Sequence, residues 1–180
     1  MAGHQPEVWI SDRYSGQQGH GQHHQTCLAH LDRKARFVEK HGSDLIGMRL
    51  KLWLDRAFDL ARDIAALAAS TVKTRRRKLL RDLDAILTTV TDCELAEELL
   101  GQIRRARDQL LTFCDFPGKV DATNNVSERA LRPSVIQRKV TNGYRAKWAA
   151  DVEADMRTTV DTARLNGANP YRTILSAVSA

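Results

Sequence analysis

Asp12 is the first residue whose place in the sequence could support chemistry. It directly follows residues 7–11, where three consecutive β-favouring apolar side chains, entered after Pro6, predict a short buried strand. Active-site groups of α/β proteins commonly lie at the carboxyl end of a strand, which makes Asp12 a candidate active-site carboxylate. The alternative is a turn-forming aspartate that hydrogen-bonds its own backbone.

Glu128 is the second candidate, and it lies 116 residues later in the chain. It follows Asn125 by three residues, which is the spacing of a capping box at the start of a helix. In that interpretation the carboxylate hydrogen-bonds the backbone and does no chemistry. The residues alone leave both roles open, a helix cap and a carboxylate that takes part in chemistry.

A tract of basic residues follows Glu128, with no acidic residue between positions 129 and 150. Its members are Arg129, Arg132, Arg138, Lys139, Arg145 and Lys147. On a helix, residues 129 and 132 share a face, as do 138 and 145. Tyr144 and Trp148 are interleaved and could stack on unpaired bases. A run of one charge sign this long favours contact with DNA phosphates over a merely solvated surface.

Two further clusters could bind an ion. Residues 73–78 (KTRRRK) open a predicted helix, and because cations disfavour a helix N-terminus, an external anion is expected there. A second cluster contains His20, His23, His24, Cys27 and His30. It could hold a transition metal such as zinc, but its spacing matches no standard zinc module, so an exposed polar loop is the alternative.

The elements that position these residues are mostly helices. Apart from the strand at 7–11 and a polar loop at 13–24, apolar residues recur at three- and four-residue steps. This pattern predicts helices at about 26–41, 45–69, 71–91, 93–114, 149–165 and 170–175. Residues 119–147 are predicted as a polar, basic stretch. The fold class is therefore mainly α with one N-terminal strand, whose backbone needs partners from elsewhere.

Composition restricts the class of protein further. The 180 residues include 20 Arg and 8 Lys and have a net charge of +6, which favours an anionic polymer as partner. The apolar content excludes a disordered chain, and no apolar run reaches the length of a membrane span. The N-terminus lacks the pattern of a secretion signal. Three scattered cysteines fit a reducing cytoplasm.

Several of these segments together resemble the C-terminal part of the catalytic domain of bacterial insertion-sequence transposases of the "sixty-six" family. That family belongs to the DDE, ribonuclease-H-like group. The resemblance rests on VWISDRY (8–14), QTCLAHL (25–31), TNN (123–125) with ERALRP (128–133) and RK (138–139), and ARLNGANP (163–170). The block around Glu128 is the most specific of these, and the resemblance covers nearly the whole chain.

The resemblance implies roles for the candidate residues. Asp12 corresponds to the second catalytic aspartate and Glu128 to the catalytic glutamate, which would hold Mg²⁺ for in-line phosphoryl transfer on DNA. The neighbouring cations would bind phosphates or neutralise the transition state. The helices between about 45 and 114 look like a helical insertion. We therefore expect three segments: part of a ribonuclease-H-like domain (1–42), the insertion (43–117) and the C-terminal part of the domain (118–180).

The departures from the family pattern are as informative as the matches. The family has a first aspartate on the first strand of a five-stranded sheet, whereas only six residues precede the strand at 7–11. We therefore expect a truncated transposase that does not cleave DNA alone, with a homo-oligomer or an intact transposase as partner. The alternative is a non-catalytic, helical DNA-binding remnant that competes with an intact transposase. Neither a membrane nor a small-molecule substrate is expected.

Overall fold

The computed structural model describes residues 5–12 and 15–179, and it divides into two units. The first unit is Met1–Asn124 and the second is Asn125–Ala180. Each unit is described by itself below. Positions 13 and 14, which belong to the VWISDRY segment, lie outside the described residues.

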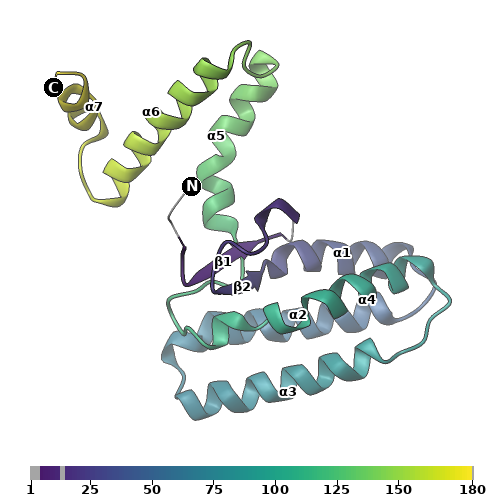
Figure 1. Ribbon diagram of the computed structural model, residues 1–180. Helices are drawn as coiled ribbons and strands as arrows, with labels where there is room; N and C mark the ends of the chain where they lie inside the picture. The colour runs from purple at the N-terminus through teal and green to yellow at the C-terminus, as the bar shows by residue number, and fades with distance from the viewer. Residues whose placement is uncertain (1–4, 13–14, 180) are drawn as a thin grey trace. The chain divides into compact units, whose positions relative to one another are not determined.

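Strands β1 (Val8–Ser11) and β2 (His23–Thr26) form a two-stranded parallel sheet in the first unit (Figure 1). The register pairs Val8 with His23 and Ser11 with Thr26. Both strands therefore end at the same edge, where Asp12 follows β1. The prediction of β1 is confirmed, but the prediction of a single strand is wrong, because residues expected in a polar loop and a helix start form β2.

Gln25 explains how so polar a segment becomes a strand. Its side chain is completely buried. The Gln25 Nε2 donates to the carbonyl of Leu110 at 3.0 Å, and its Oε1 accepts from the backbone amide of Phe113 at 2.9 Å. The hydroxyl of Thr112 donates to the carbonyl of His24 at 2.7 Å. Because these partners lie more than 80 residues away, apolar periodicity cannot reveal the strand.

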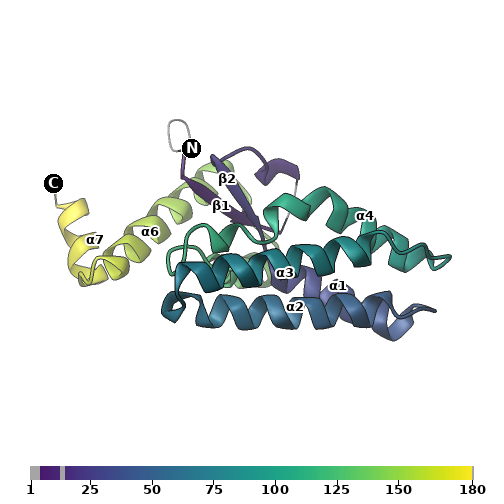
Figure 2. The same cartoon turned by 90° about the horizontal axis from the view of Figure 1, so that it is seen from below.

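Four helices follow the sheet and pack as antiparallel hairpins, as predicted from their apolar stripes (Figures 1 and 2). They are α1 (Leu28–His41), α2 (Ile46–Asp63), α3 (Ala69–Leu87) and α4 (Glu94–Ala106). Their stripes bury one apolar core that includes Trp53, Leu83, Leu100 and Phe113. The indole Nε1 of Trp53 donates to the carbonyl of Leu79 at 2.8 Å, so this buried polar group is satisfied.

Helices α2, α3 and α4 end several residues earlier than the predicted boundaries. Short 3₁₀ turns follow two of them, η2 (Ile64–Ala66) after α2 and η3 (Arg107–Gln109) after α4. A third turn, η4 (Thr112–Cys114), donates hydrogen bonds to β2 from the Phe113 amide and the Thr112 hydroxyl. The apolar pattern continues past the helix ends because Ile64 of η2, Leu110 after η3 and Phe113 of η4 are buried in the core, although the helical hydrogen bonding has ended.

Gly47 allows α1 and α2 to cross closely. A Cβ atom at this position would lie 2.2 Å from the backbone nitrogen of Glu39 in α1. No side chain fits at that distance, so the crossing requires glycine. Glycine is required at position 47 because of the packing between α1 and α2.

The second unit contains three helices, α5 (Asn125–Thr141), α6 (Lys147–Leu165) and α7 (Pro170–Val178). The predictions of α6 and of α7 are confirmed, and the Asn169 side chain caps α7 by accepting from the amide of Arg172 at 3.2 Å. A complete α5 was not predicted, because Pro133 lies inside it and its apolar residues follow no clear stripe. Residues Asn142 and Gly143, both at positive φ, end this helix.

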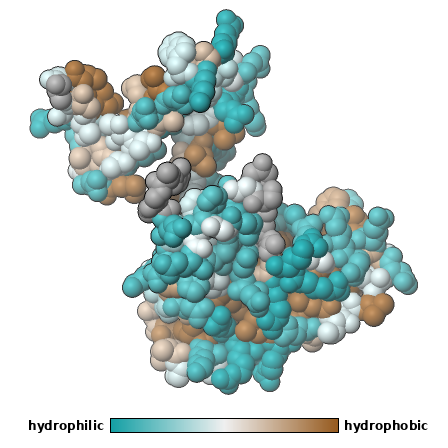
Figure 3. Space-filling view, viewed as in Figure 1, coloured by the Kyte–Doolittle hydropathy of each residue, from teal (hydrophilic) through white to brown (hydrophobic). Residues whose placement is uncertain are grey.

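Ala163 is the only buried residue among those described in the second unit. Large apolar side chains lie exposed on all three helices, as the brown areas in Figure 3 show. Leu131, Val140, Trp148 and Leu165 are examples. The second unit therefore has almost no apolar core of its own.

Candidate nucleic-acid and metal site

Asp12 lies exposed at the carboxyl edge of the two-stranded sheet, directly after β1. Two contacts from Ser11 hold the end of β1 against β2 and the residue that follows it. Ser11 Oγ lies 3.0 Å from Nε2 of His24 on β2, and the Ser11 carbonyl accepts from the backbone amide of Cys27 at 2.8 Å. The next residue of the chain, Leu28, begins α1. A strand end held in this way presents the Asp12 carboxylate from a fixed backbone.

The histidine and cysteine cluster is distributed over separate structural roles. His20 stacks against Trp9 with ring centroids 5.3 Å apart, and His23 stacks against Phe116 at 5.6 Å. Cys27 is completely buried, and its sulfur accepts from the backbone amide of Asn124 at 3.4 Å. Across the described part of the chain, no three His, Cys, Asp or Glu side chains gather as they would around a metal ion. The structure thus does not bring His20, His23, His24, Cys27 and His30 together as a zinc site.

Glu128 lies in the first turn of α5, and its side chain is exposed. Asn125 is already helical, so it is not the residue before the helix that a capping box requires. Glu128 lines an open hollow of about 490 Å³ along α5, together with Arg129, Leu131 and Arg132. On one helix, a carboxylate can bind a metal ion while the two guanidinium groups beside it bind an anion. This part of α5 therefore suits an anionic ligand that carries a metal ion.

All six predicted DNA-binding cations lie on the second unit and are exposed: Arg129, Arg132, Arg138, Lys139, Arg145 and Lys147. None of the six forms an ion pair with a residue that the structure describes. Arg129 and Arg132 do share α5, as predicted. Arg138 and Arg145 do not share one helical face, because α5 ends at Thr141.

A groove of about 620 Å³ runs between α5 and α6. Tyr144 donates its hydroxyl to Glu153, and Arg157 donates to the same carboxylate at 2.6 Å. The hydrogen bond from Tyr144, together with Arg157, lowers the pKa of Glu153. Arg157 also reaches Gln137 on α5 at 3.3 Å. The Tyr144 hydroxyl is therefore engaged within the protein, whereas Trp148 is exposed and can stack on a base.

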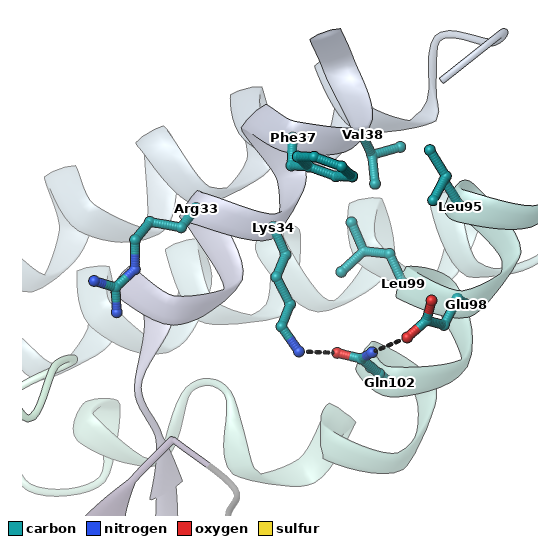
Figure 4. Close-up of a pocket in the computed structure, with 8 residues that line it drawn as sticks. All are labelled: Arg33, Lys34, Phe37, Val38, Leu95, Glu98, Leu99 and Gln102. Carbon is teal, nitrogen blue, oxygen red and sulfur yellow. Dashed lines mark hydrogen bonds between the residues drawn. The ribbon is translucent and has the colours of Figure 1, made fainter. Parts of the chain in front are cut away.

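A separate groove of about 290 Å³ lies between α1 and α4 in the first unit (Figure 4). Phe37, Leu95 and Leu99 form its apolar part. A polar chain lies at one rim, where Lys34 donates to Gln102 at 2.5 Å and Gln102 donates to Glu98 at 3.0 Å. The groove contains none of the residues predicted for catalysis or DNA binding.

Residues 2–152 match the model of the transposase IS66 family. This chain belongs to that family. No curated protein and no solved structure gives a significant match. The matched part of this IS66 transposase chain contains Asp12, Glu128 and all six cations of the basic tract.

Membership in the IS66 family confirms the resemblance seen in the sequence and gives this protein a transposase-related function, with DNA as the partner. Asp12 belongs to the first unit and Glu128 to the second. Within the described part of this IS66 chain, none of the helices combines the length and the apolar character that a membrane crossing requires.

Proposed function

We propose that this chain acts in DNA transposition, where it binds DNA through the basic tract and contributes Asp12 and Glu128 to a phosphoryl-transfer site of a ribonuclease-H-like domain. The observation that carries the proposal is the match to the IS66 family over residues 2–152, which includes both carboxylates. The exposed position of Asp12 at the carboxyl edge of a parallel sheet supports it further.

The chemistry of the two side chains suits Mg²⁺. Carboxylate oxygens are hard ligands of the kind that Mg²⁺ prefers, and both carboxylates are exposed. When bound between such carboxylates, Mg²⁺ activates an attacking hydroxyl and stabilises the leaving oxygen of an in-line displacement. Asp12 at the end of β1 and Glu128 in the first turn of α5 would each supply a carboxylate for Mg²⁺.

The cations beside Glu128 would bind and orient the DNA. Arg129 and Arg132 each present a planar guanidinium that can donate two parallel hydrogen bonds to a phosphate. Because they line the same hollow as Glu128, they can hold the DNA backbone at the carboxylate. Arg138, Lys139, Arg145 and Lys147 would extend this contact along the DNA by charge neutralisation.

The family's reaction uses three carboxylates, and this chain offers two that correspond to them. We therefore expect the 180-residue chain to bind DNA and divalent metal without cutting DNA. The test is incubation with supercoiled plasmid and Mg²⁺ or Mn²⁺, followed by electrophoresis for nicked product. Metal-dependent nicking that disappears in Glu128→Gln would contradict the expected inactivity and would support the site.

Metal binding is tested separately by titrating Mn²⁺ and observing its paramagnetic signal. Asp12→Asn and Glu128→Gln should each weaken binding in the presence of DNA. The matched controls are Asp63→Asn and Glu94→Gln, which remove exposed carboxylates from the end of α2 and the first turn of α4. Equal Mn²⁺ binding by all four variants would contradict a role of Asp12 and Glu128 in metal binding.

The second candidate function is a non-catalytic DNA-binding protein that competes with, or associates with, an intact transposase. The observation that favours it is the set of exposed cations, which need no metal to bind phosphate. Here DNA affinity falls steeply with salt and is unchanged by chelation of divalent ions. Loss of DNA binding on addition of a chelator would contradict this function and favour the metal-dependent one.

A further inference from the structure

Helix α3 carries a strip of cations that has no ion-pair partner among the described residues. We define the α3 strip as Lys73, Arg75, Arg77, Lys78 and Arg81. All five side chains are exposed, and none forms an ion pair with any residue within the described ranges. Because α3 begins at Ala69, the strip lies beyond the first turn, and the helix N-terminus does not account for it.

The acidic residues of α3 do not balance this charge. Asp82 accepts from Arg56 of α2 at 2.5 Å, and Asp84 accepts from both Nε and Nη2 of Arg107 at 2.7 Å. These two carboxylates are therefore neutralised by cations of other elements. Arg76, which lies within the same run, pairs with Asp115 at 2.7 Å and is left out of the strip. What remains on the outer surface of α3 is positive charge alone.

The helix places the strip away from the core. Val72, Leu79, Leu83 and Ile86 form the buried face of α3. Lys73, Arg77 and Arg81 follow one another at four-residue steps, so they form a row on the outer face with about 6 Å of helix rise between members. In the view of Figure 3, hydrophilic side chains cover much of the edge of the first unit that α3 forms in Figure 1.

The strip also lies at the end of the hairpins that carries the sheet. Arg76 within the run contacts Asp115, which directly follows η4. Turn η4 in turn holds β2 through Thr112 and Phe113. The strip and Asp12 therefore belong to one packed unit and are connected through η4, so a polymer bound along α3 would be held in a fixed relation to Asp12.

We propose that the α3 strip is a second DNA-binding surface, which holds the phosphate backbone of duplex DNA. Residues 69–87 contain no aromatic side chain that could stack on unpaired bases, and no Asn or Gln that could read an adenine, so the strip suits a duplex backbone. The choice of DNA as the polymer rests on the proposed transposition function. The strip itself needs neither metal nor Glu128.

The experiment compares two charge-matched double variants of the full chain. Lys73→Gln/Arg77→Gln removes one Lys and one Arg from the strip, and Arg33→Gln/Lys40→Gln removes the same two types from exposed positions on α1. Glutamine keeps a similar helix propensity, so both variants should fold. Binding to a labelled duplex is followed by fluorescence anisotropy at increasing salt concentration, and circular dichroism checks the fold.

The strip variant should lower the slope of log affinity against log salt by about one per lost contact, and its affinity at low salt should fall roughly tenfold. The α1 variant should keep the slope of the wild type. Equal slopes for the strip variant and the wild type would overturn this inference while leaving the proposed function intact. If the wild type binds single strands or anionic vesicles but no duplex, both the inference and the proposed function are wrong.

Discussion

The two units of this protein differ most in what they bury. In the first unit, four helices and two strands enclose a continuous apolar core, and the buried polar groups of Gln25 and Trp53 are hydrogen-bonded. In the second unit, three well-formed helices bury only Ala163 among the residues that the structure describes. The free energy of burial therefore stabilises the first unit far more than the second.

The comparison of the two units shows that helix formation and fold stability have separate causes in this protein. Helices α5, α6 and α7 are defined by local signals, such as the Asn169 cap and the turn at Asn142 and Gly143. Helices α1 to α4 are defined by amphipathic stripes that pack against one another. The same substitution should therefore have different effects in the two units.

The largest expected contrast comes from removing one leucine in each unit. Leu83→Ala in α3 empties a completely buried position and should lower the free energy of unfolding by about 2–5 kcal/mol. Leu131→Ala in α5 changes a side chain that is 62% exposed and should stay within about 0.5 kcal/mol. Urea unfolding followed by circular dichroism measures both. Equal losses would mean that the α5 surface is covered in solution.

The second contrast concerns two glycines inside helices of the first unit. Gly47→Ala places a Cβ against the backbone of α1 and should destabilise by about 1–3 kcal/mol or more. Gly101→Ala in α4 meets only the end of the Arg105 side chain, at 3.6 Å, and should stabilise by about 0.5–1 kcal/mol. Thermal unfolding of the two variants gives the signs. A neutral Gly47→Ala would show that α1 and α2 cross less tightly than the structure has them.

The third contrast compares two residues whose side chains hold the start of a helix. Asp44 accepts from the amide of Ile46 at the start of α2, as Asn169 does from Arg172 at α7. Asp44→Ala and Asn169→Ala should each cost about 1 kcal/mol. Amide hydrogen exchange should show global loss of protection in the first unit for Asp44→Ala, and fraying confined to α7 for Asn169→Ala. Global loss in both variants would argue that the two units unfold together.

The smallest effect concerns the ion pair between Arg107 and Asp84, which ties η3 to α3. Its hydrogen bonds lower the pKa of Asp84 below the usual value for an aspartate. A lowered pKa in the folded state stabilises above the unfolded pKa of about 4, and this stability is lost as the pH falls through the folded pKa. Because both side chains are more than one third exposed, the contribution is about 1 kcal/mol or less.

Asp84→Asn should therefore flatten the loss of stability between about pH 4 and pH 2, measured as the urea midpoint at each pH. Asp63→Asn is the control, since this exposed carboxylate forms no ion pair with a described residue. If both variants follow the pH profile of the wild type, the Asp84 pair does not contribute to acid stability.

Most of the first unit could be predicted from the sequence, because stripes such as Leu79, Leu83 and Ile86 record the packing directly. Strand β2 could not, because a buried glutamine and hydrogen bonds from distant residues hold it. Helix α5 was missed for a different reason. Pro133 interrupts its pattern, and its apolar side chains face no core that would impose a period.

The candidate site was predictable as a set of residue types, through the family resemblance, but its local structure was only partly so. The family match includes Asp12 and Glu128, and the structure describes each on its own element. The capping box, one of the two roles left open for Glu128, does not match the structure, because α5 already includes Asn125. The histidines follow no standard zinc spacing, and His20 and His23 lie against the rings of Trp9 and Phe116.

Pro133 gives α5 a mechanical property that the rest of the helix lacks. It has no amide proton, so the carbonyl of Arg129 receives no bond from it, and the rod is softened at that point. The arm beyond Pro133 is about 12 Å long, so a bend of about 20° would displace its tip by roughly 4 Å. Bending at Pro133 would therefore move Arg138 and Lys139 to follow a curved polymer, while Glu128, which lies before Pro133, would keep its position.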